Sequence, residues 1–147
     1  MSSSRFPSAD APEAIGQDVV GIGSSADIVA ARLRGRTMAT ALGFAGSDLT
    51  VIATAISELA RNILQYAGQG EIVMQLLDRG RDQGLMVLAR DRGPGIADLS
   101  MAMEDGYSTS GRLGLGLPGV RRLMDEFQIE SGVGTGTHVR VVKWNCM

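Results

Sequence analysis

Asp91 and the glycines that follow it have the residue types and spacing of a ledge that binds a flat ligand. Asp91 closes an apolar run at residues 85–89, and Gly93 and Gly95 come next. Glycine has no Cβ, so a planar ring can approach the backbone closely. The Asp91 carboxylate can accept a hydrogen bond from an exocyclic amine such as that of adenine. The alternative is that Asp91 is a turn residue before the Gly-Pro-Gly bend.

Glu58 and Asn62 lie four residues apart in a segment with helical periodicity, so both project from one side of the helix. The amide oxygen of Asn62 is a hard ligand suited to Mg²⁺, which fills its other positions with water and phosphate oxygens. The alternative is that Glu58 pairs with Arg61 on the helix surface, which contributes only about 0.3 kcal/mol, and that Asn62 has no role.

A glycine-rich run at residues 111–119 leads into a helix expected at about residues 117–126. No Ser, Thr, Asp or Asn caps this start, so its free backbone N–H groups need an outside acceptor, and a phosphate would satisfy them. The polar loop at residues 105–116 is predicted to be mobile and able to close over a ligand. Its hydroxyls either bind phosphate or are simply solvated: Tyr107, Ser108, Thr109 and Ser110.

Residues 114–119 spell Gly-x-Gly-x-x-Gly, which is also the dinucleotide-binding fingerprint. That motif should follow a strand inside a βαβ unit. Here a polar loop precedes it and no parallel crossover pattern follows, so we reject this interpretation.

Composition limits the classes of protein to consider. A chain of 147 residues with 44% hydrophobic content fits one domain, and a net charge of −2 does not favour nucleic acid or an anionic membrane as partner. One cysteine, Cys146, and one histidine, His138, argue against a disulfide and against a Cys/His zinc site. No apolar run has the length of a membrane span, and the N-terminus lacks the layout of a secretion signal. We expect a cytoplasmic protein.

The remaining pattern predicts one α+β domain. Residues 1–12, rich in Ser, Pro and Ala, are expected to be disordered, and residues 13–147 to form the domain. Ser24 and Asp27 resemble a capping box for a first helix ending at Gly43, whose arginines 32, 34 and 36 form either a solvated face or a docking surface. A second helix, capped by Ser47 or Asp48, runs to Gly68.

The strands are expected at residues 17–22, 71–78, 85–91, 127–131 and 137–144. Residues 79–84 would join the second and third strands as a hairpin, residues 98–104 would form a short helix, and residues 132–136 a turn. Thr137 heads the last strand and can reach the same base as Asp91 if the two strands are neighbours. Otherwise it is an ordinary strand threonine. The sum is a two-layer sandwich with helices on one face of a mostly antiparallel sheet.

Four segments in this order resemble the RsbT-type kinases, small anti-sigma regulatory serine/threonine kinases within the superfamily that includes gyrase, histidine kinases and MutL. The segments are Ile56-Ser57-Glu58-Leu59-Ala60-Arg61-Asn62, Asp91-Arg92-Gly93-Pro94-Gly95, Glu104-Asp105-Gly106-Tyr107-Ser108-Thr109-Ser110 and the stretch GLGLPGVRRLMDEF at residues 114–127. The resemblance covers roughly residues 15–144.

The resemblance implies the Bergerat ATP-binding fold with ATP and Mg²⁺ as cofactors. Asn62 would bind Mg²⁺, Asp91 the adenine amine, Gly93 and Gly95 would lie beside the ring, and Thr137 would support Asp91. Glu58, in the family's catalytic position, would be the general base. Residues 111–119 would form the lid and phosphate cradle, with Gly111, Gly114, Leu115, Gly116 and Leu117 binding the nucleotide. Ser108, Thr109 and Ser110, just before this range, would also bind it.

The resemblance also implies partners. The substrate would be a serine or threonine of a STAS-domain antagonist in a bacterial partner-switching stress response, with a PP2C-type phosphatase or a sigma factor downstream. A different class of function is an anti-sigma factor or ATP-sensing module that sequesters a partner with little turnover. A third is a nucleotide hydrolase without a protein acceptor.

Overall fold

The structure is a computed structural model that describes residues 13–95, 103 and 116–145. The predicted disorder of residues 1–12, the predicted helix at 98–104 apart from Met103, and the predicted loop up to residue 115 lie outside the described residues. The elements in chain order are β1 (Glu13–Ile22), α1 (Ser25–Ala41), α2 (Ser47–Tyr66), β2 (Gly70–Arg79), β3 (Asp82–Asp91), α4 (Gly116–Leu123), β4 (Glu126–Gly132) and β5 (Gly136–Asn145).

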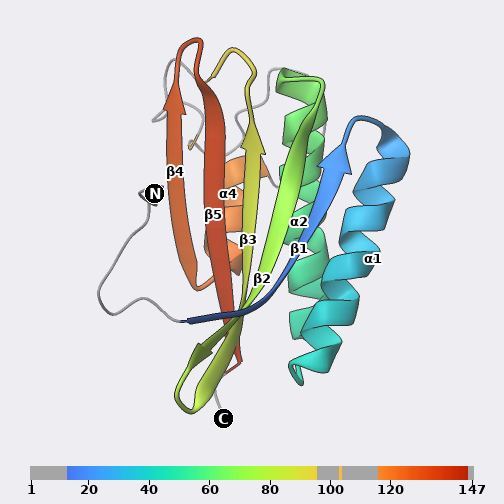
Figure 1. Cartoon of the computed structure of the whole chain (residues 1–147), viewed down its shortest axis with the longest axis vertical. Coiled ribbons are helices and arrows are strands. Elements are labelled where there is room, and N and C mark those ends of the chain that lie inside the picture. Colours follow the sequence, from blue (N-terminus) through green and yellow to red (C-terminus); the bar gives the residue numbers. More distant parts are fainter. Residues whose placement is uncertain (1–12, 96–102, 104–115, 146–147) are drawn as a thin grey trace.

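The strands form one sheet in the order β1-β2-β3-β5-β4, and every neighbouring pair is antiparallel. The three labelled helices lie on one side of this sheet (Figure 1). The predicted α+β sandwich is therefore confirmed. None of the helices in the described ranges combines the length and the apolar character required to cross a bilayer.

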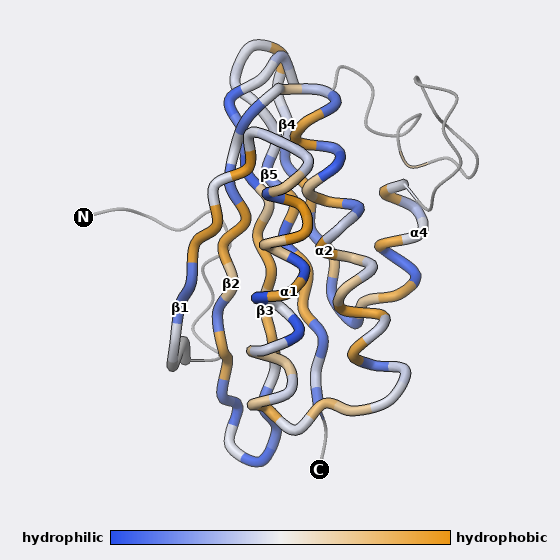
Figure 2. Tube along the Cα trace, turned by 90° about the vertical axis from the view of Figure 1, so that its right-hand side faces the viewer, coloured by the Kyte–Doolittle hydropathy of each residue, from blue (hydrophilic) through white to orange (hydrophobic). Residues whose placement is uncertain are grey.

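The main core lies between the sheet and α2, the helix with the strongest predicted periodicity. Seen from the side, the chain forms two layers, and hydrophobic segments recur in both (Figure 2). Burying such apolar surface is the dominant favourable contribution to folding. The fully or almost fully buried side chains of α2 and the facing strands are Ile52, Ile56, Leu59, Ile63, Ile72, Met74, Leu85, Val87 and Val141.

Two local predictions at element ends need correction. The β2–β3 connection is only two residues, Gly80 and Arg81, because strand pairing continues to Arg79 and Asp82. Gly80 has a φ of +64°, which glycine adopts without a Cβ penalty. Helix α2 begins at Ser47 itself, and Gly46 precedes it without a side-chain cap.

The start of α1 also differs in detail from a capping box. Asp27 accepts hydrogen bonds from the Gly23 N–H (2.8 Å) and the Ser24 hydroxyl (3.2 Å), while the Ser24 side chain caps no backbone group. Arg34, one of the three predicted surface arginines, forms an ion pair with Asp18 of β1 (2.7 Å). That contact ties α1 to the edge strand of the sheet.

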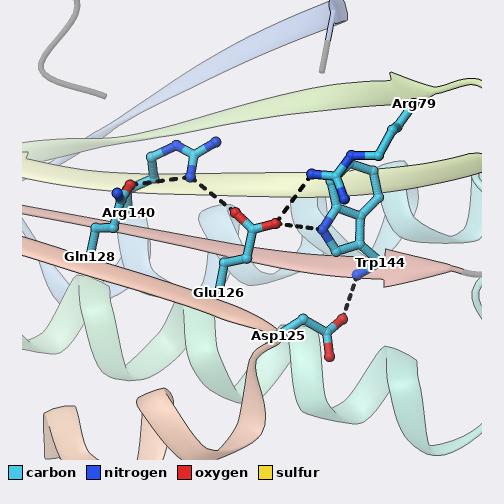
Figure 3. A network of polar contacts seen from close by, with 6 residues as sticks. All are labelled: Arg79, Asp125, Glu126, Gln128, Arg140 and Trp144. Carbon is cyan, nitrogen blue, oxygen red and sulfur yellow. Dashed lines mark hydrogen bonds and ion pairs between the residues drawn. The ribbon is translucent and has the colours of Figure 1, made fainter. Parts of the chain in front are cut away.

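The predicted helix at residues 117–126 ends earlier, at Leu123. The Asp125 N–H donates to the Val142 carbonyl oxygen (2.9 Å), and β4 begins at the next residue. On the sheet face opposite the helices, Glu126 accepts a hydrogen bond from the Trp144 indole N–H (2.7 Å) (Figure 3). The sequence pattern predicts that the helix continues through residue 126. Contacts of Asp125 and Glu126 with β5 end it earlier.

Trp144 organises a second apolar cluster on that face. Leu77, Met86 and Val142 are buried there, and Trp144 packs against them. The indole lies so close to Gly84 that a Cβ at this glycine would be 2.7 Å from the ring. The Arg79 guanidinium lies 4.1 Å from the ring centroid, a cation–π distance. The side chains of Arg79 and Glu126 thus contact the Trp144 indole on this face (Figure 3).

Candidate functional site

At one end of the sheet, five residues from the five strands lie side by side in a cross-strand row. The strand register pairs Ile22 with Gly70, Gly70 with Asp91, Asp91 with Thr137, and Thr137 with Ser131. Side chains alternate between faces along a strand. Because Ala89 and Val139, two residues away, are in the main core, Asp91 and Thr137 point to the helix side. The condition that the strand of Thr137 neighbours that of Asp91 is met.

Asp91 is partly buried, and one of its oxygens is used by the turn that follows. Oδ1 accepts a hydrogen bond from the Gly93 N–H at 2.8 Å. This bond fits the turn interpretation and also fixes the orientation of the carboxylate. Oδ2 makes no hydrogen bond to any residue in the described part of the chain. The turn therefore orients Asp91 while leaving one oxygen for a ligand.

Gly93 and Gly95 are also required by the packing of the protein's own backbone. A Cβ on Gly93 would lie 2.6 Å from Ala67 Cβ at the end of α2. A Cβ on Gly95 would overlap the Gly132 carbonyl oxygen, and the Gly134 N–H donates to the Pro94 carbonyl oxygen (2.9 Å). The turn after β3 therefore packs directly on the β4–β5 turn. That the two glycines lie beside a purine remains a prediction.

Gly136 shows how tightly these turns meet, and it provides a test. Its φ is +92°, and a Cβ there would overlap the Asp91 carbonyl oxygen. Gly134 has a similar φ of +81° but open space around a Cβ. We expect Gly134→Ala to lower the free energy of unfolding by about 1 kcal/mol from backbone strain alone. Gly136→Ala should cost about 2 kcal/mol more, because it adds an overlap with backbone.

Urea unfolding followed by circular dichroism measures both effects. Equal losses in the two variants would mean that the turns are not in contact as described.

The other two candidate residues, Asn62 and Glu58, lie on α2 at increasing distance from the Asp91 turn. Ala67, after the last turn of α2, touches Gly93. Asn62 and then Glu58 follow toward the helix N-terminus, and four residues correspond to about 6 Å along the axis. A triphosphate that begins at a base on Asp91 can therefore extend past Asn62 to Glu58.

Glu58 is 7% exposed, and its Oε2 lies 2.8 Å from Arg61 Nη1. The alternative pairing with Arg61 is thus present, although Glu58 is buried rather than on the helix surface. Asn62 is half-buried, and its side chain makes no hydrogen bond to any described residue.

The donor set at Asn62 fits Mg²⁺ only if a ligand supplies most of the coordination. Within the described ranges, no three side chains of His, Cys, Asp or Glu come together as metal ligands. Mg²⁺ bound to phosphates commonly takes only one or two protein ligands and keeps water. Asn62 would be such a ligand, and phosphate oxygens would provide the remainder.

Helix α4 begins at Gly116, with a φ of +61°, and buries Leu117 and Val120. Of the predicted nucleotide-binding residues in this stretch, the structure describes Gly116 and Leu117, the first two residues of α4. The others lie outside the described residues: Ser108, Thr109, Ser110, Gly111, Gly114 and Leu115.

A cavity of about 890 Å³ opens at the same end of the sheet, lined in part by Gly21, Gly70, Arg90, Asp91 and His138. Neither Asn62 nor Glu58 lines it, so the cavity reaches Asp91 from the side of β1 and β2. Ser131 was not among the predicted site residues, yet its hydroxyl lies 2.8 Å from that of Thr137. Only the pairing of β4 with β5 reveals it.

Known proteins resemble this chain in sequence and in fold. A family model described as histidine kinase-like ATPase domain matches residues 24–143. Serine/threonine-protein kinase RsbT of Bacillus subtilis is 56% identical over 129 residues, covering 87% of this chain and 96% of that protein. An anti-sigma F factor of Caldanaerobacter subterraneus is 31% identical over 66% of this chain and 71% of its own length.

Among solved structures, the RsbU and RsbW domains of Rv1364c from Mycobacterium tuberculosis superpose with a TM-score of 0.57 at 20% identity. The match covers 88% of this chain but only about a third (32%) of that one, and it supports the fold alone.

Proposed function

This chain belongs to the histidine kinase-like ATPase family and, within it, to the RsbT-type serine/threonine-protein kinases, and we propose that it transfers the γ-phosphoryl group of Mg-ATP to a partner protein. The observation that carries the proposal is the placement of Asp91, Asn62 and Glu58. They follow one another from the sheet end along α2, in the order in which a base, a metal-bound triphosphate and an acceptor hydroxyl would need them.

The adenine would lie against the Asp91 turn. Asp91 Oδ2 would accept a hydrogen bond from the adenine amine, with Thr137 directly opposite on β5. Gly93 and Gly95 would let the ring approach the backbone. Gly116 and Leu117, at the start of α4, would add backbone N–H donors for phosphate.

Asn62 would hold Mg²⁺ through its amide oxygen. The bound ion neutralises phosphate charge, which is a large part of what phosphoryl transfer requires.

Glu58 would act as general base at the acceptor. The hydroxyl oxygen of a serine or threonine forms the new bond to the γ-phosphorus, and the bond from that phosphorus to the β–γ bridging oxygen breaks. ADP leaves with the electron pair. Glu58 takes the hydroxyl proton on one carboxylate oxygen while Arg61 holds the other.

The partner would be a STAS-domain antagonist, with a PP2C-type phosphatase or a sigma factor as a second partner. The similarity to anti-sigma F factors supports an alternative, in which the chain sequesters a partner with little turnover. Capture from cell extract separates the two. A STAS protein or phosphatase as main prey favours the kinase, and a sigma factor favours sequestration.

The direct experiment uses γ-labelled ATP, Mg²⁺ and the cognate STAS protein. We expect label on a serine or threonine of that protein. Absence of transfer would overturn the kinase assignment for this substrate. Phosphate release that no partner changes would instead favour a simple hydrolase.

A further inference from the structure

Glu58 is the one charged side chain in the described part of the chain that is buried. Among the described residues, only Arg61 hydrogen-bonds its carboxylate, with Nη1 donating to Oε2 at 2.8 Å. A carboxylate removed from water is stable as an anion only beside a positive charge or several donors. Arg61 therefore supplies the counter-charge that the buried carboxylate requires.

Burial distinguishes this contact from an ordinary surface ion pair. The Glu58 side chain is 10% exposed and that of Arg61 is 35% exposed, whereas Asp18 and Arg34 are 29% and 56% exposed in their pair. Water screens an exposed pair, so the loss of one partner changes little. The loss of one partner from a buried pair leaves a charge without compensation. Removing Arg61 should therefore act directly on Glu58.

Arg61 contacts Glu58 from the side opposite to Asn62. Successive helical residues are rotated by about 100°, so Asn62 lies about 40° from Glu58 in one direction around the helix axis and Arg61 about 60° in the other. A metal on Asn62 and the Arg61 guanidinium would thus flank the carboxylate without competing for one position. Oε1 of Glu58 makes no hydrogen bond to any described residue, so it is the oxygen left to take a proton.

We propose that Arg61 is a positioning residue for the general base, which holds Glu58 as an anion and turns Oε1 toward the acceptor hydroxyl. The proposal rests on the phosphoryl transfer proposed above and deepens it, since Arg61 acts through Glu58 and touches neither the nucleotide nor the acceptor. A carboxylate takes a proton only when it is ionised and within hydrogen-bond reach of that proton. A displacement of about 1 Å can cost about a hundredfold in rate.

Arg61→Gln should slow single-turnover transfer to the proposed STAS-domain substrate by about 10- to 100-fold. Calorimetry should give dissociation constants for Mg-ATP and Mg-ADP like those of wild type, because the nucleotide does not contact Arg61. Arg61→Lys should recover most of the rate, since one nitrogen makes the contact and lysine keeps the charge. Arg79→Gln is the control, because Arg79 also pairs with a glutamate, Glu126 (3.6 Å), on the sheet face opposite the helices. It should transfer as wild type does.

A double-mutant cycle separates positioning from a direct role. If Arg61 acts through Glu58, the variant Glu58→Gln/Arg61→Gln should transfer as slowly as Glu58→Gln alone, because no base remains to be positioned. A further loss of about tenfold in the double variant would overturn the proposal, since Arg61 would then act on the phosphates or the acceptor itself. The same comparison serves if Arg61→Gln alone does not fold, because the double variant no longer buries a charge without a partner.

Transfer at the wild-type rate in Arg61→Gln, or no recovery in a folded Arg61→Lys, would overturn the role of Arg61 and leave the proposed kinase intact. Weaker binding of ATP but not of ADP in Arg61→Gln would also overturn it, because Arg61 would then bind the γ-phosphate. A wild type that transfers nothing overturns the proposed function itself, and the positioning role with it.

Discussion

Replacing Asp91 by asparagine is expected to weaken ATP binding about a hundredfold without unfolding the protein. Oδ1 of Asp91 is held by the Gly93 N–H, and an asparagine oxygen can take that place. Its NH₂ group then occupies the position of Oδ2 and meets the adenine amine donor to donor. The loss of a charge-assisted hydrogen bond and the unpaired donors together account for about 2.7 kcal/mol.

Calorimetry with Mg-ATP measures this loss, and urea unfolding checks that the fold is intact. Asp125→Asn is the control, because Asp125 accepts a hydrogen bond from the Trp144 backbone N–H, in the network around Trp144 and away from the Asp91 turn. It should bind ATP as wild type does. Wild-type affinity in Asp91→Asn would show that the base lies elsewhere.

Replacing Glu58 by glutamine should slow phosphoryl transfer by about 10² to 10⁴ while ATP binding changes little. Glutamine keeps the shape and can still accept a hydrogen bond from Arg61, but it cannot take the acceptor proton. A positioned general base typically contributes a factor of that size. Single-turnover transfer to the proposed STAS-domain substrate, at saturating ATP, isolates the chemical step.

Glu71→Gln is a matched control, since Glu71 also pairs with an arginine, Arg90, but points to the sheet face opposite the helices, because its strand neighbour Ile72 is in the main core. Its transfer rate should equal that of wild type. If Glu58→Gln transfers as fast as wild type, Glu58 is not the base. If it loses ATP affinity instead, Glu58 binds the nucleotide rather than the acceptor.

The elements with strong periodicity were predictable, and the errors fell where contacts distant in sequence decide. Helix α2 and strands β2 and β3 follow their patterns of apolar residues. The end of α4 does not, because Asp125 and Glu126 suit a helix in isolation but bond Val142 and Trp144 across the sheet. Propensity gives way to tertiary contacts there.

For the site, sequence spacing alone brings Glu58 and Asn62 together, since both lie on one helix. The position of Asp91 next to Thr137 depends on the strand order. The sequence pattern alone did not determine whether the strands of these two residues are neighbours. Ser131 could not be recognised, because a lone serine in a strand carries no signal until the register places it beside Thr137. The phosphate-cradle residues 108–115 remain predictions.

A crystal structure with Mg²⁺ and a non-hydrolysable ATP analogue tests the proposed site most directly. We expect the adenine amine about 3 Å from Asp91 Oδ2 and Mg²⁺ about 2.1 Å from the Asn62 amide oxygen, with the γ-phosphate beyond it toward Glu58. A nucleotide bound with its base away from Asp91, or a metal that Asn62 does not touch, would contradict the site proposed for this kinase.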